Sequence, residues 1–331
     1  TLTTNVQRSQ ALAATDATKI GLSNFDSASF GLSSPTNLGW KTLTFGNSLY
    51  VGVAVNGVIN TSTDALTWTA RGSGTTSTLT AVVYGTVYVT AGTGGVVASS
   101  TDAITWTVRT SGTVSNIRGL TYSSGGVYVY GTAGGGISTS ADGTTWTTRT
   151  SNTASQINTM IYGTAYVYAG VGGVVGSSTD AITWTVRTSQ TTSSIYALGF
   201  GNSLHVYAGH NGALATSTDG TTWTARTSAT TSSVFGIAFG NSAYVAVGDN
   251  GVIQSSTDAI TWTVRTSPTT SSLISVIYNS GFYAVGGNAV FTSTDGTTWT
   301  NNGGVTTTEN LTVVGYGSTF VRGSQNGSIA T

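Results

Sequence analysis

The sequence has no cysteine and only two prolines, and charged residues make up 7% of its 331 positions. Without cysteine, neither a disulfide nor a thiolate metal site can form. The scarcity of proline fits uninterrupted strand ladders, because proline cannot donate a hydrogen bond to them. Basic and acidic residues are equal in number, so the formal charge is zero. We therefore expect no nucleic-acid partner, which would need a basic face.

Long apolar runs are also missing, which predicts that no segment spans a membrane. The first twenty residues lack the apolar block of a signal peptide. Hydrophobic residues nevertheless make up 38% of the chain and aromatic residues 10%, which is enough material for a core. Together these proportions predict a folded protein rather than a disordered one.

An internal repeat dominates what is present. The string STDAITWTVRTS occurs three times, at 100–111, 178–189 and 256–267, and near-copies begin at residues 62, 140, 217 and 293. The Asp of each copy lies 37 to 40 residues from the next, and a Trp follows each Asp four residues later. A fixed period of this length is typical of propellers, solenoids and other repeat arrays.

Each repeat reads as four short strands and no helix. Three β-branched or aromatic runs, as in residues 79–100, are separated by Gly-Asn, Gly-Thr or Asn-Gly turns, and TWTVR supplies the fourth run. Trp106 and Val108 would lie on one face of that run, and Thr107 and Arg109 on the other. The pattern predicts an all-β protein.

The repeats are offset by one strand. The three-run pattern occurs eight times, whereas the clear Asp motif occurs seven times, and the last copy stops at Thr331. Residues 23–34, with Asp26 and Phe30 in the Asp and Trp places, match the missing piece. We therefore expect an eight-bladed β-propeller of four-stranded antiparallel blades over 22–331, closed by an N-terminal strand that completes the C-terminal blade. Seven blades is the alternative, and residues 1–21 form an N-terminal arm.

The Ser/Thr-x-Asp-x-x-x-Thr-Trp string, as in STDGTTWT at 217–224, resembles the Asp-box (BNR) repeat of sialidases and other propellers. The resemblance covers nearly the whole chain and implies a fold but no activity, because the motif occurs in enzymes and non-enzymes alike. An Asp in such a turn would accept hydrogen bonds from backbone N–H groups further along. We expect this structural role for Asp26, Asp64, Asp102, Asp142, Asp180, Asp219, Asp258 and Asp295.

We expect no catalytic residues. The resemblance to sialidases implies a tyrosine nucleophile paired with a glutamate, but the chain has a single glutamate, Glu309. Only Asp16, Asp249 and Glu309 are acidic residues outside the repeated motif, and nothing pairs them for glycoside hydrolysis. His205 and His210 share one repeat and lack a third ligand nearby, so we expect no metal site and no cofactor.

The candidate binding residues fall into two sets. An arginine follows six of the motifs. Either these arginines bind a glycan or a protein, or they have a structural role, in which each caps neighbouring carbonyls or pairs with an Asp of the adjacent blade. This set is Arg71, Arg109, Arg149, Arg187, Arg226 and Arg265. The second set consists of residues that differ between repeats, of which we select Tyr196, His210 and Asp249.

Near-identical Thr/Ser/Gly-rich repeats of low charge are similar to those of bacteriophage virion proteins. This resemblance implies a non-enzymatic structural or adsorption protein, a tail or capsid appendage that takes part in host attachment. Its partners would be other virion proteins, bound through residues 1–21, and cell-surface glycan. The alternatives are a secreted glycan-binding lectin, located outside the cell or on a bacterial surface, and a sialidase-like glycoside hydrolase.

Overall fold

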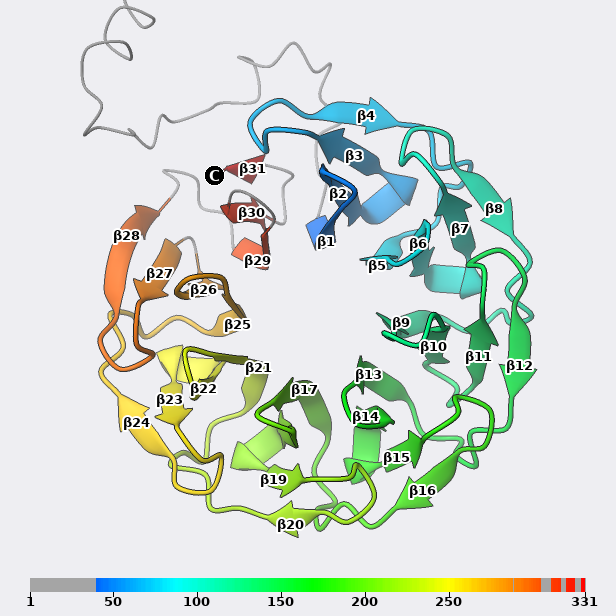
Figure 1. The fold of residues 1–331 in the computed structure, drawn as a ribbon. Helices are drawn as coiled ribbons and strands as arrows, with labels where there is room; N and C mark the ends of the chain where they lie inside the picture. Colours follow the sequence, from blue (N-terminus) through cyan, green and yellow to red (C-terminus); the bar gives the residue numbers. More distant parts are fainter. Residues whose placement is uncertain (1–39, 288, 305–310, 317–319, 325–328, 331) are drawn as a thin grey trace, which may run out of the picture.

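The protein is described by a computed structural model covering residues 40–287, 289–304, 311–316, 320–324 and 329–330. Its strands form separate antiparallel sheets that stand around a common centre, as in a β-propeller (Figure 1). In each sheet the strands follow one another in chain order, with the first strand innermost and the last at the perimeter. We number the four-stranded sheets blades 1 to 7 in chain order.

The first three blades contain twelve strands, from β1 to β12. Blade 1 comprises β1 (Trp40–Gly46), β2 (Leu49–Ala54), β3 (Ile59–Ser62) and β4 (Thr69–Arg71). Blade 2 comprises β5 (Leu79–Tyr84), β6 (Tyr88–Gly92), β7 (Val97–Ser100) and β8 (Thr107–Arg109). Blade 3 comprises β9 (Ile117–Tyr122), β10 (Tyr128–Thr132), β11 (Ile137–Ser140) and β12 (Thr147–Arg149).

The next four blades repeat this plan. Blade 4 comprises β13 (Ile157–Tyr162), β14 (Tyr166–Gly170), β15 (Val175–Ser178) and β16 (Thr185–Arg187). Blade 5 comprises β17 (Ile195–Gly201), β18 (Leu204–Gly209), β19 (Leu214–Ser217) and β20 (Thr224–Ala225). Blade 6 comprises β21 (Val234–Gly240), β22 (Ala243–Gly248), β23 (Ile253–Ser256) and β24 (Thr263–Arg265). Blade 7 comprises β25 (Leu273–Tyr278), β26 (Phe282–Gly286), β27 (Ala289–Ser293) and β28 (Thr300–Gly304).

Short turns join the strands, and two kinds matter for the site. Five blades have a 3-10 turn between the second and third strands: η2 (Val55–Gly57), η3 (Thr93–Gly95), η4 (Val171–Gly173), η5 (His210–Gly212) and η6 (Asp249–Gly251). At the opposite end of the blade, the repeated Ser-x-Asp motif joins the third strand to the fourth. We call this second connection the aspartate turn.

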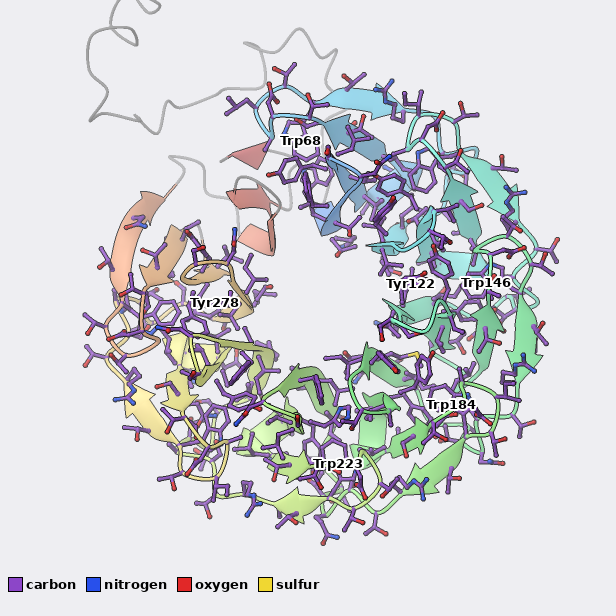
Figure 2. All side chains as sticks on the ribbon, viewed as in Figure 1. Trp68, Tyr122, Trp146, Trp184, Trp223 and Tyr278 are labelled. Carbon is purple, nitrogen blue, oxygen red and sulfur yellow. The ribbon has the colours of Figure 1, made fainter. Side chains whose placement is uncertain are left out.

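The core lies between successive blades. One cluster, for example, joins Val167 and Val175 of blade 4 to Ile195 and Trp223 of blade 5. The second strands are buried almost throughout, whereas the outermost strands expose their first two residues. Because apolar area removed from water supplies most of the stabilisation, each blade depends on its neighbour for its stability. Figure 2 shows side chains filling the space between neighbouring sheets.

Aromatic rings pack on glycines from one blade to the next. Five blades end their first strand, or begin the turn after it, with a glycine that contacts an aromatic ring of the following blade. A Cβ on Gly240 would lie 1.9 Å from Cγ of Tyr278, and a Cβ on Gly201 would lie 2.1 Å from Cγ of Phe239. The ring therefore occupies the space where any other residue has its side chain. The pairs are Gly46–Tyr84, Gly85–Tyr122, Gly163–Phe200, Gly201–Phe239 and Gly240–Tyr278.

The prediction of eight four-stranded blades is wrong, because the structure has seven four-stranded blades. The last sheet, β29 (Leu311–Tyr316), β30 (Phe320–Ser324) and β31 (Ile329–Ala330), has three strands in the part of the chain that the structure describes. Its first strand contacts both β25 and β1, so it lies between blades 7 and 1 (Figure 1). Residues 23–34, which we expected to complete this sheet, lie outside the described residues.

Candidate functional site

Each aspartate turn is closed by its own Asp. In blade 2, Oδ1 of Asp102 accepts hydrogen bonds from the N–H groups of Ile104 (2.8 Å) and Thr105 (2.9 Å) and from the hydroxyl of Ser100 (2.9 Å). These backbone donors lower the pKa of Asp102, because they favour the charged carboxylate. The same contacts occur at Asp64, Asp142, Asp180, Asp219, Asp258 and Asp295. Asp26 lies outside the described residues.

The tryptophan of the motif is buried behind this turn in six of the seven blades, and Trp146 of blade 3 is half-buried. The indole Nε1–H of Trp184 donates to the carbonyl oxygen of Ala181 at 3.1 Å, and its ring lies 5.6 Å from the ring of Tyr168, centroid to centroid. Figure 2 places Trp68, Trp146, Trp184 and Trp223 within the blades, away from the centre of the ring. The repeated motif therefore builds the frame, and its residues are spread around the whole ring rather than gathered at one site.

The six arginines lie on or directly after the outermost strands, and each is tied to its own blade. Nε of Arg109 donates to Oγ of Ser99 at 2.8 Å, and Nε of Arg187 donates to Oγ of Ser177 at 2.9 Å. The partner is a hydroxyl on the neighbouring strand, rather than a carbonyl or an Asp of the adjacent blade. Because the residues are distributed around the perimeter, they do not converge on one ligand. The same contact is made by Arg71, Arg149, Arg226 and Arg265.

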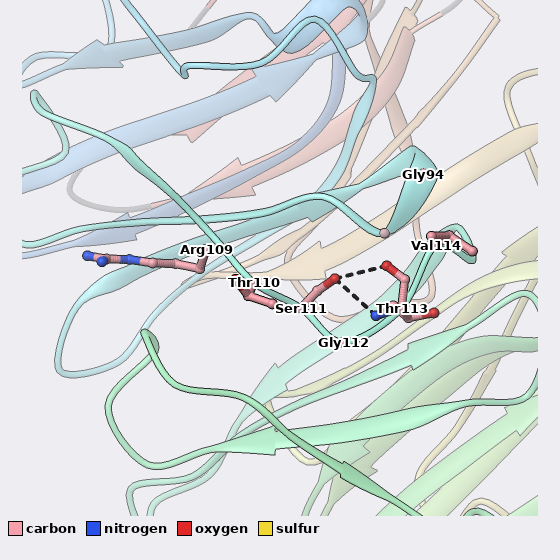
Figure 3. Close-up of a pocket in the computed structure, with 8 residues that line it drawn as sticks. Gly94, Arg109, Thr110, Ser111, Gly112, Thr113 and Val114 are labelled. Carbon is pink, nitrogen blue, oxygen red and sulfur yellow. Dashed lines mark hydrogen bonds between the residues drawn. The ribbon is translucent and has the colours of Figure 1, made fainter.

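Two equivalent open grooves lie beside the 3-10 turns of blades 1 and 2. The groove in blade 2 has a volume of about 640 Å³ and is lined by Gly94, Gly95 and residues 109–114 (Figure 3). Hydrogen bonds between Ser111 and Thr113 hold its loop, and the Arg109 side chain extends away from that loop (Figure 3). The groove in blade 1, of about 740 Å³, is formed by the matching residues. Their lining is mostly small residues that recur from blade to blade.

A β-bulge interrupts the innermost strand of every blade at the same place. In blade 1, Trp40 and Thr42 pair with the consecutive residues Ala54 and Val53, so Lys41 is the extra residue. Bulges of this kind redirect a side chain and are common beside binding sites. Ala54 directly precedes η2, so the bulge lies at the end of the blade that has the 3-10 turns. The seven bulge residues are Lys41, Thr80, Arg118, Asn158, Tyr196, Phe235 and Ile274.

The seven bulge residues are at least partly exposed, and all differ in type. They surround the centre of the ring, because they belong to the strands that line it (Figure 1). Some extend toward the following blade: the Asn158 amide donates to the carbonyl oxygen of Ile195 at 2.8 Å, and the Thr80 hydroxyl donates to that of Ile117 at 2.6 Å. This ring of bulge residues is the candidate functional site.

The structure brings together two of the three residues that the sequence selected for differing between repeats, Tyr196 and His210. The rings of Tyr196 and His210 lie 6.4 Å apart in an edge-on arrangement. Nδ1 of His210 lies 3.0 Å from Oγ of Ser233, and the carbonyl oxygen of Ser233 accepts the Asp249 N–H at 2.9 Å. Tyr196 and His210 are therefore in contact, and Asp249 is linked to them only through its backbone, since its carboxylate faces Ser272 toward blade 7.

Sequence reasoning missed Phe235, whose ring lies 5.6 Å from that of Tyr196. A signal for it was available, because aligning the repeats shows that this position differs among the seven four-stranded blades, and only Thr312 of the last sheet repeats one of these residues, Thr80. Among the described residues, no group of three His, Cys, Asp or Glu is arranged to hold a metal. No helix in the same part of the chain is long and apolar enough to cross a membrane.

The second histidine lies apart from the first. His205, on β18, is fully buried and occupies the position that is Tyr88 in blade 2 and Tyr244 in blade 6. Those tyrosine hydroxyls donate to a glycine carbonyl of the preceding blade, whereas His205 Nε2 lies 3.0 Å from Oγ1 of Thr164. Its Nδ1 has no hydrogen-bond partner. Burial lowers the pKa of His205 to about 4, against a weaker opposing effect of Asp219.

Because burial lowers the pKa of His205, we expect the folded protein to lose stability in mild acid. The unfolded chain takes up a proton near pH 6.5 and the folded chain only near pH 4, so the stabilisation is present above pH 6.5 and declines as the pH falls toward 4. We expect a loss of about 2 kcal/mol between pH 7 and pH 5. Urea unfolding measured between pH 7 and pH 5 should show this decrease in the free energy of unfolding of the parent chain.

Two substitutions test the assignment. His205→Tyr and His205→Phe insert residues that other blades have at this position, and both should flatten the slope between pH 7 and pH 5. Tyr should also restore the donor hydroxyl that Phe lacks, so the Tyr variant should be the more stable of the two. An unchanged slope in both variants would show that another group causes the acid sensitivity.

No protein-family model matches the chain, and no curated protein matches it. Solved structures do resemble it. The computationally designed Ika8 protein is 16% identical with a TM-score of 0.73, and the match covers 88% of this chain and 95% of that one. The C-terminal WD40 domain of Sif2 is 12% identical with a TM-score of 0.68, covering 89% and 96%. Virginiamycin B lyase from Staphylococcus aureus is 14% identical with a TM-score of 0.65, covering 88% and 96%. These similarities show a β-propeller fold and do not show a family or an activity.

Proposed function

We propose that the protein is a non-enzymatic binding propeller that serves as a structural or adsorption component of a phage particle, as a tail or capsid appendage. One observation carries the binding role: the frame repeats, with the same Asp and Trp in each aspartate turn, whereas the bulge residue differs among the seven four-stranded blades and recurs only once, as Thr312 in the last sheet. A uniform scaffold that presents one varied ring is suited to recognising a surface.

The placement on a particle rests on the character of the repeats. Their Thr/Ser/Gly-rich, weakly charged sequence resembles that of phage virion proteins, and residues 1–21 would attach the propeller to other virion proteins. The bulge ring would then face the host cell and contact its surface glycans. A secreted lectin, free or on a bacterial surface, is the second candidate. The Tyr196–Phe235 aromatic pair favours it, because aromatic faces suit sugar rings.

Particle composition tests this proposal. We expect purified particles to contain the chain in a fixed copy number, and deletion of residues 1–21 to remove it from them while leaving the propeller folded. Mass spectrometry of gradient-purified particles measures both, and circular dichroism of the truncated chain checks the fold. Recovery of the chain only in the free, secreted fraction would favour the lectin. Turnover of a fluorogenic sialoside or other glycoside would contradict a non-enzymatic role.

A further inference from the structure

We propose that Tyr196, Phe235, His210 and Asp249 form a saccharide-binding site, with the two aromatic rings receiving the apolar face of a pyranose. The inference deepens the proposed function and rests on its assumption that the bulge ring is the recognition surface. It selects one sector of that ring, shared by blades 5 and 6, and one class of ligand.

The aromatic platform is the first argument. Tyr196 and Phe235 are bulge residues of adjacent blades, both partly exposed, with ring centroids 5.6 Å apart and planes inclined at 46°. Ile274, the bulge residue of blade 7, is 38% exposed and extends the apolar sector. Elsewhere in the blades, aromatic side chains such as Tyr207 and Tyr244 are buried in the core. Tyr196 and Phe235 are instead partly exposed, as are aromatic residues nearer the other end of the first strands, such as Tyr122 and Tyr278.

Polar groups at the edge of the platform supply the second argument. His210 is exposed in η5, and its contact with Ser233 through Nδ1 leaves Nε2 for a ligand hydroxyl. Oδ1 of Asp249 accepts the hydroxyl of Ser272 at 2.7 Å, and Oδ2 has no donor among the described residues. Ser233 contacts the His210 imidazole through Oγ and the Asp249 backbone N–H through its carbonyl oxygen, so η5 and η6 are linked, while the Asp249 carboxylate faces Ser272 toward blade 7.

This combination fits a sugar better than other flat or apolar ligands. A pyranose has an apolar C–H face that can lie on an aromatic ring, and hydroxyls around its edge that donate to a carboxylate or an imidazole. A nucleic acid would place phosphates beside Asp249, and the chain has no net positive charge to offset that repulsion. An apolar peptide would gain from the rings but would leave the carboxylate without a donor.

Two cations belong to the same ring of bulge residues. Lys41 in blade 1 and Arg118 in blade 3 are both exposed, whereas blades 5 to 7 present Tyr196, Phe235 and Ile274. An acidic saccharide long enough to extend from the platform would meet one of these charges, and a neutral saccharide would not. The difference in affinity between neutral and uronic-acid-containing oligosaccharides therefore shows how far the bound saccharide extends around the ring of bulge residues.

The test uses the full chain on an array of neutral and uronic-acid oligosaccharides, followed by calorimetry with the oligosaccharide that gives the strongest signal. We expect binding, and we expect Phe235→Thr and Tyr196→Asn each to weaken it by about tenfold. Thr and Asn occupy the bulge in blades 2 and 4, so the fold should tolerate them. Asp249→Asn should weaken binding by removing the charged acceptor.

The matched control is Ile260→Thr. Ile260 is an exposed apolar residue in the aspartate turn of blade 6, and Thr is the residue that the turns of blades 3, 5 and 7 have there. This variant should bind like the parent chain. Arg118→Ala should weaken binding of uronic-acid oligosaccharides and leave neutral ones unchanged.

Failure of every oligosaccharide to bind, or equal binding by the parent chain and Phe235→Thr, would overturn the saccharide site. Selective capture of apolar or proline-rich peptides on a parallel peptide array would overturn the ligand class. Neither result affects the particle assay, so the adsorption role and the saccharide site can fail separately. Sugar binding by a chain that is absent from particles would support the site and reject the placement on a particle.

Discussion

Replacing Trp184 with alanine should lower the free energy of unfolding by about 4 kcal/mol. The indole is 1% exposed, packs against Tyr166 and Tyr168, and satisfies the carbonyl oxygen of Ala181. Its removal would leave a cavity between the aspartate turn and the strands of blade 4, and would also free a buried hydrogen-bond acceptor. Urea unfolding followed by far-ultraviolet circular dichroism measures the loss.

Trp184→Phe is the graded comparison for this prediction. It keeps an aromatic ring but loses the indole N–H, so its loss should be well below that of alanine. A second comparison is Val186→Ala, which shortens a side chain that is 42% exposed on the neighbouring outer strand, and which should have little effect. A Trp184→Ala variant as stable as the parent chain would mean that the motif does not secure the blade.

Adding a single methyl group at Gly240 should cost about 3 kcal/mol. The new Cβ in Gly240→Ala would lie 1.9 Å from Cγ of Tyr278, and that ring has little room to retreat, because Phe282 lies 4.9 Å away, centroid to centroid. Blades 6 and 7 would have to separate, or the ring would have to leave its position. The same unfolding measurement applies.

Gly72→Ala serves as the matched control, because a Cβ at Gly72 meets nothing within 4 Å and its φ lies outside the left-handed region. We expect Gly72→Ala to be neutral or slightly stabilising, since alanine restricts the unfolded chain. Equal stability of the two variants would show that the aromatic-on-glycine contacts add nothing to the association of blades.

The strands, the antiparallel blades and the positions of the aspartate turns could be predicted from the sequence, because each depends on neighbours within one repeat. Spacing placed Asp102 in a turn, with Trp106 four residues after it. Blade number was predicted less well. It depends on whether a distant segment completes the last sheet, and the match of residues 23–34 to the motif indicated eight four-stranded blades where the structure has seven.

The candidate site could not be predicted from features within a single repeat. Tyr196, His210 and Asp249 were selected only because they differ between repeats, and the partners of their side chains depend on how neighbouring blades pack. Phe235 was not selected, although aligning the repeats shows that its position varies, because the bulge that exposes it is a property of two paired strands and cannot be read from one of them. The contacts of the arginines were not foreseen for a related reason: the partner of Arg109 is the hydroxyl of Ser99 on the neighbouring strand, two residues from the one it pairs with, and spacing along the chain does not suggest it.

The exact recurrence of STDAITWTVRTS in blades 2, 4 and 6 means that their outer strands are interchangeable. Edge pairing alone gives β16 no preference for β15 over β7 or β23. Connectivity decides, since the aspartate turn brings β16 to β15 through a short loop, whereas reaching β7 would close a loop of nearly two repeats at an added cost of about 2 kcal/mol. At high protein concentration β16 can also pair with the third strand of a blade in a second molecule, and the entropic advantage of pairing within one molecule is then smaller. Refolding at high concentration should therefore produce strand-swapped dimers.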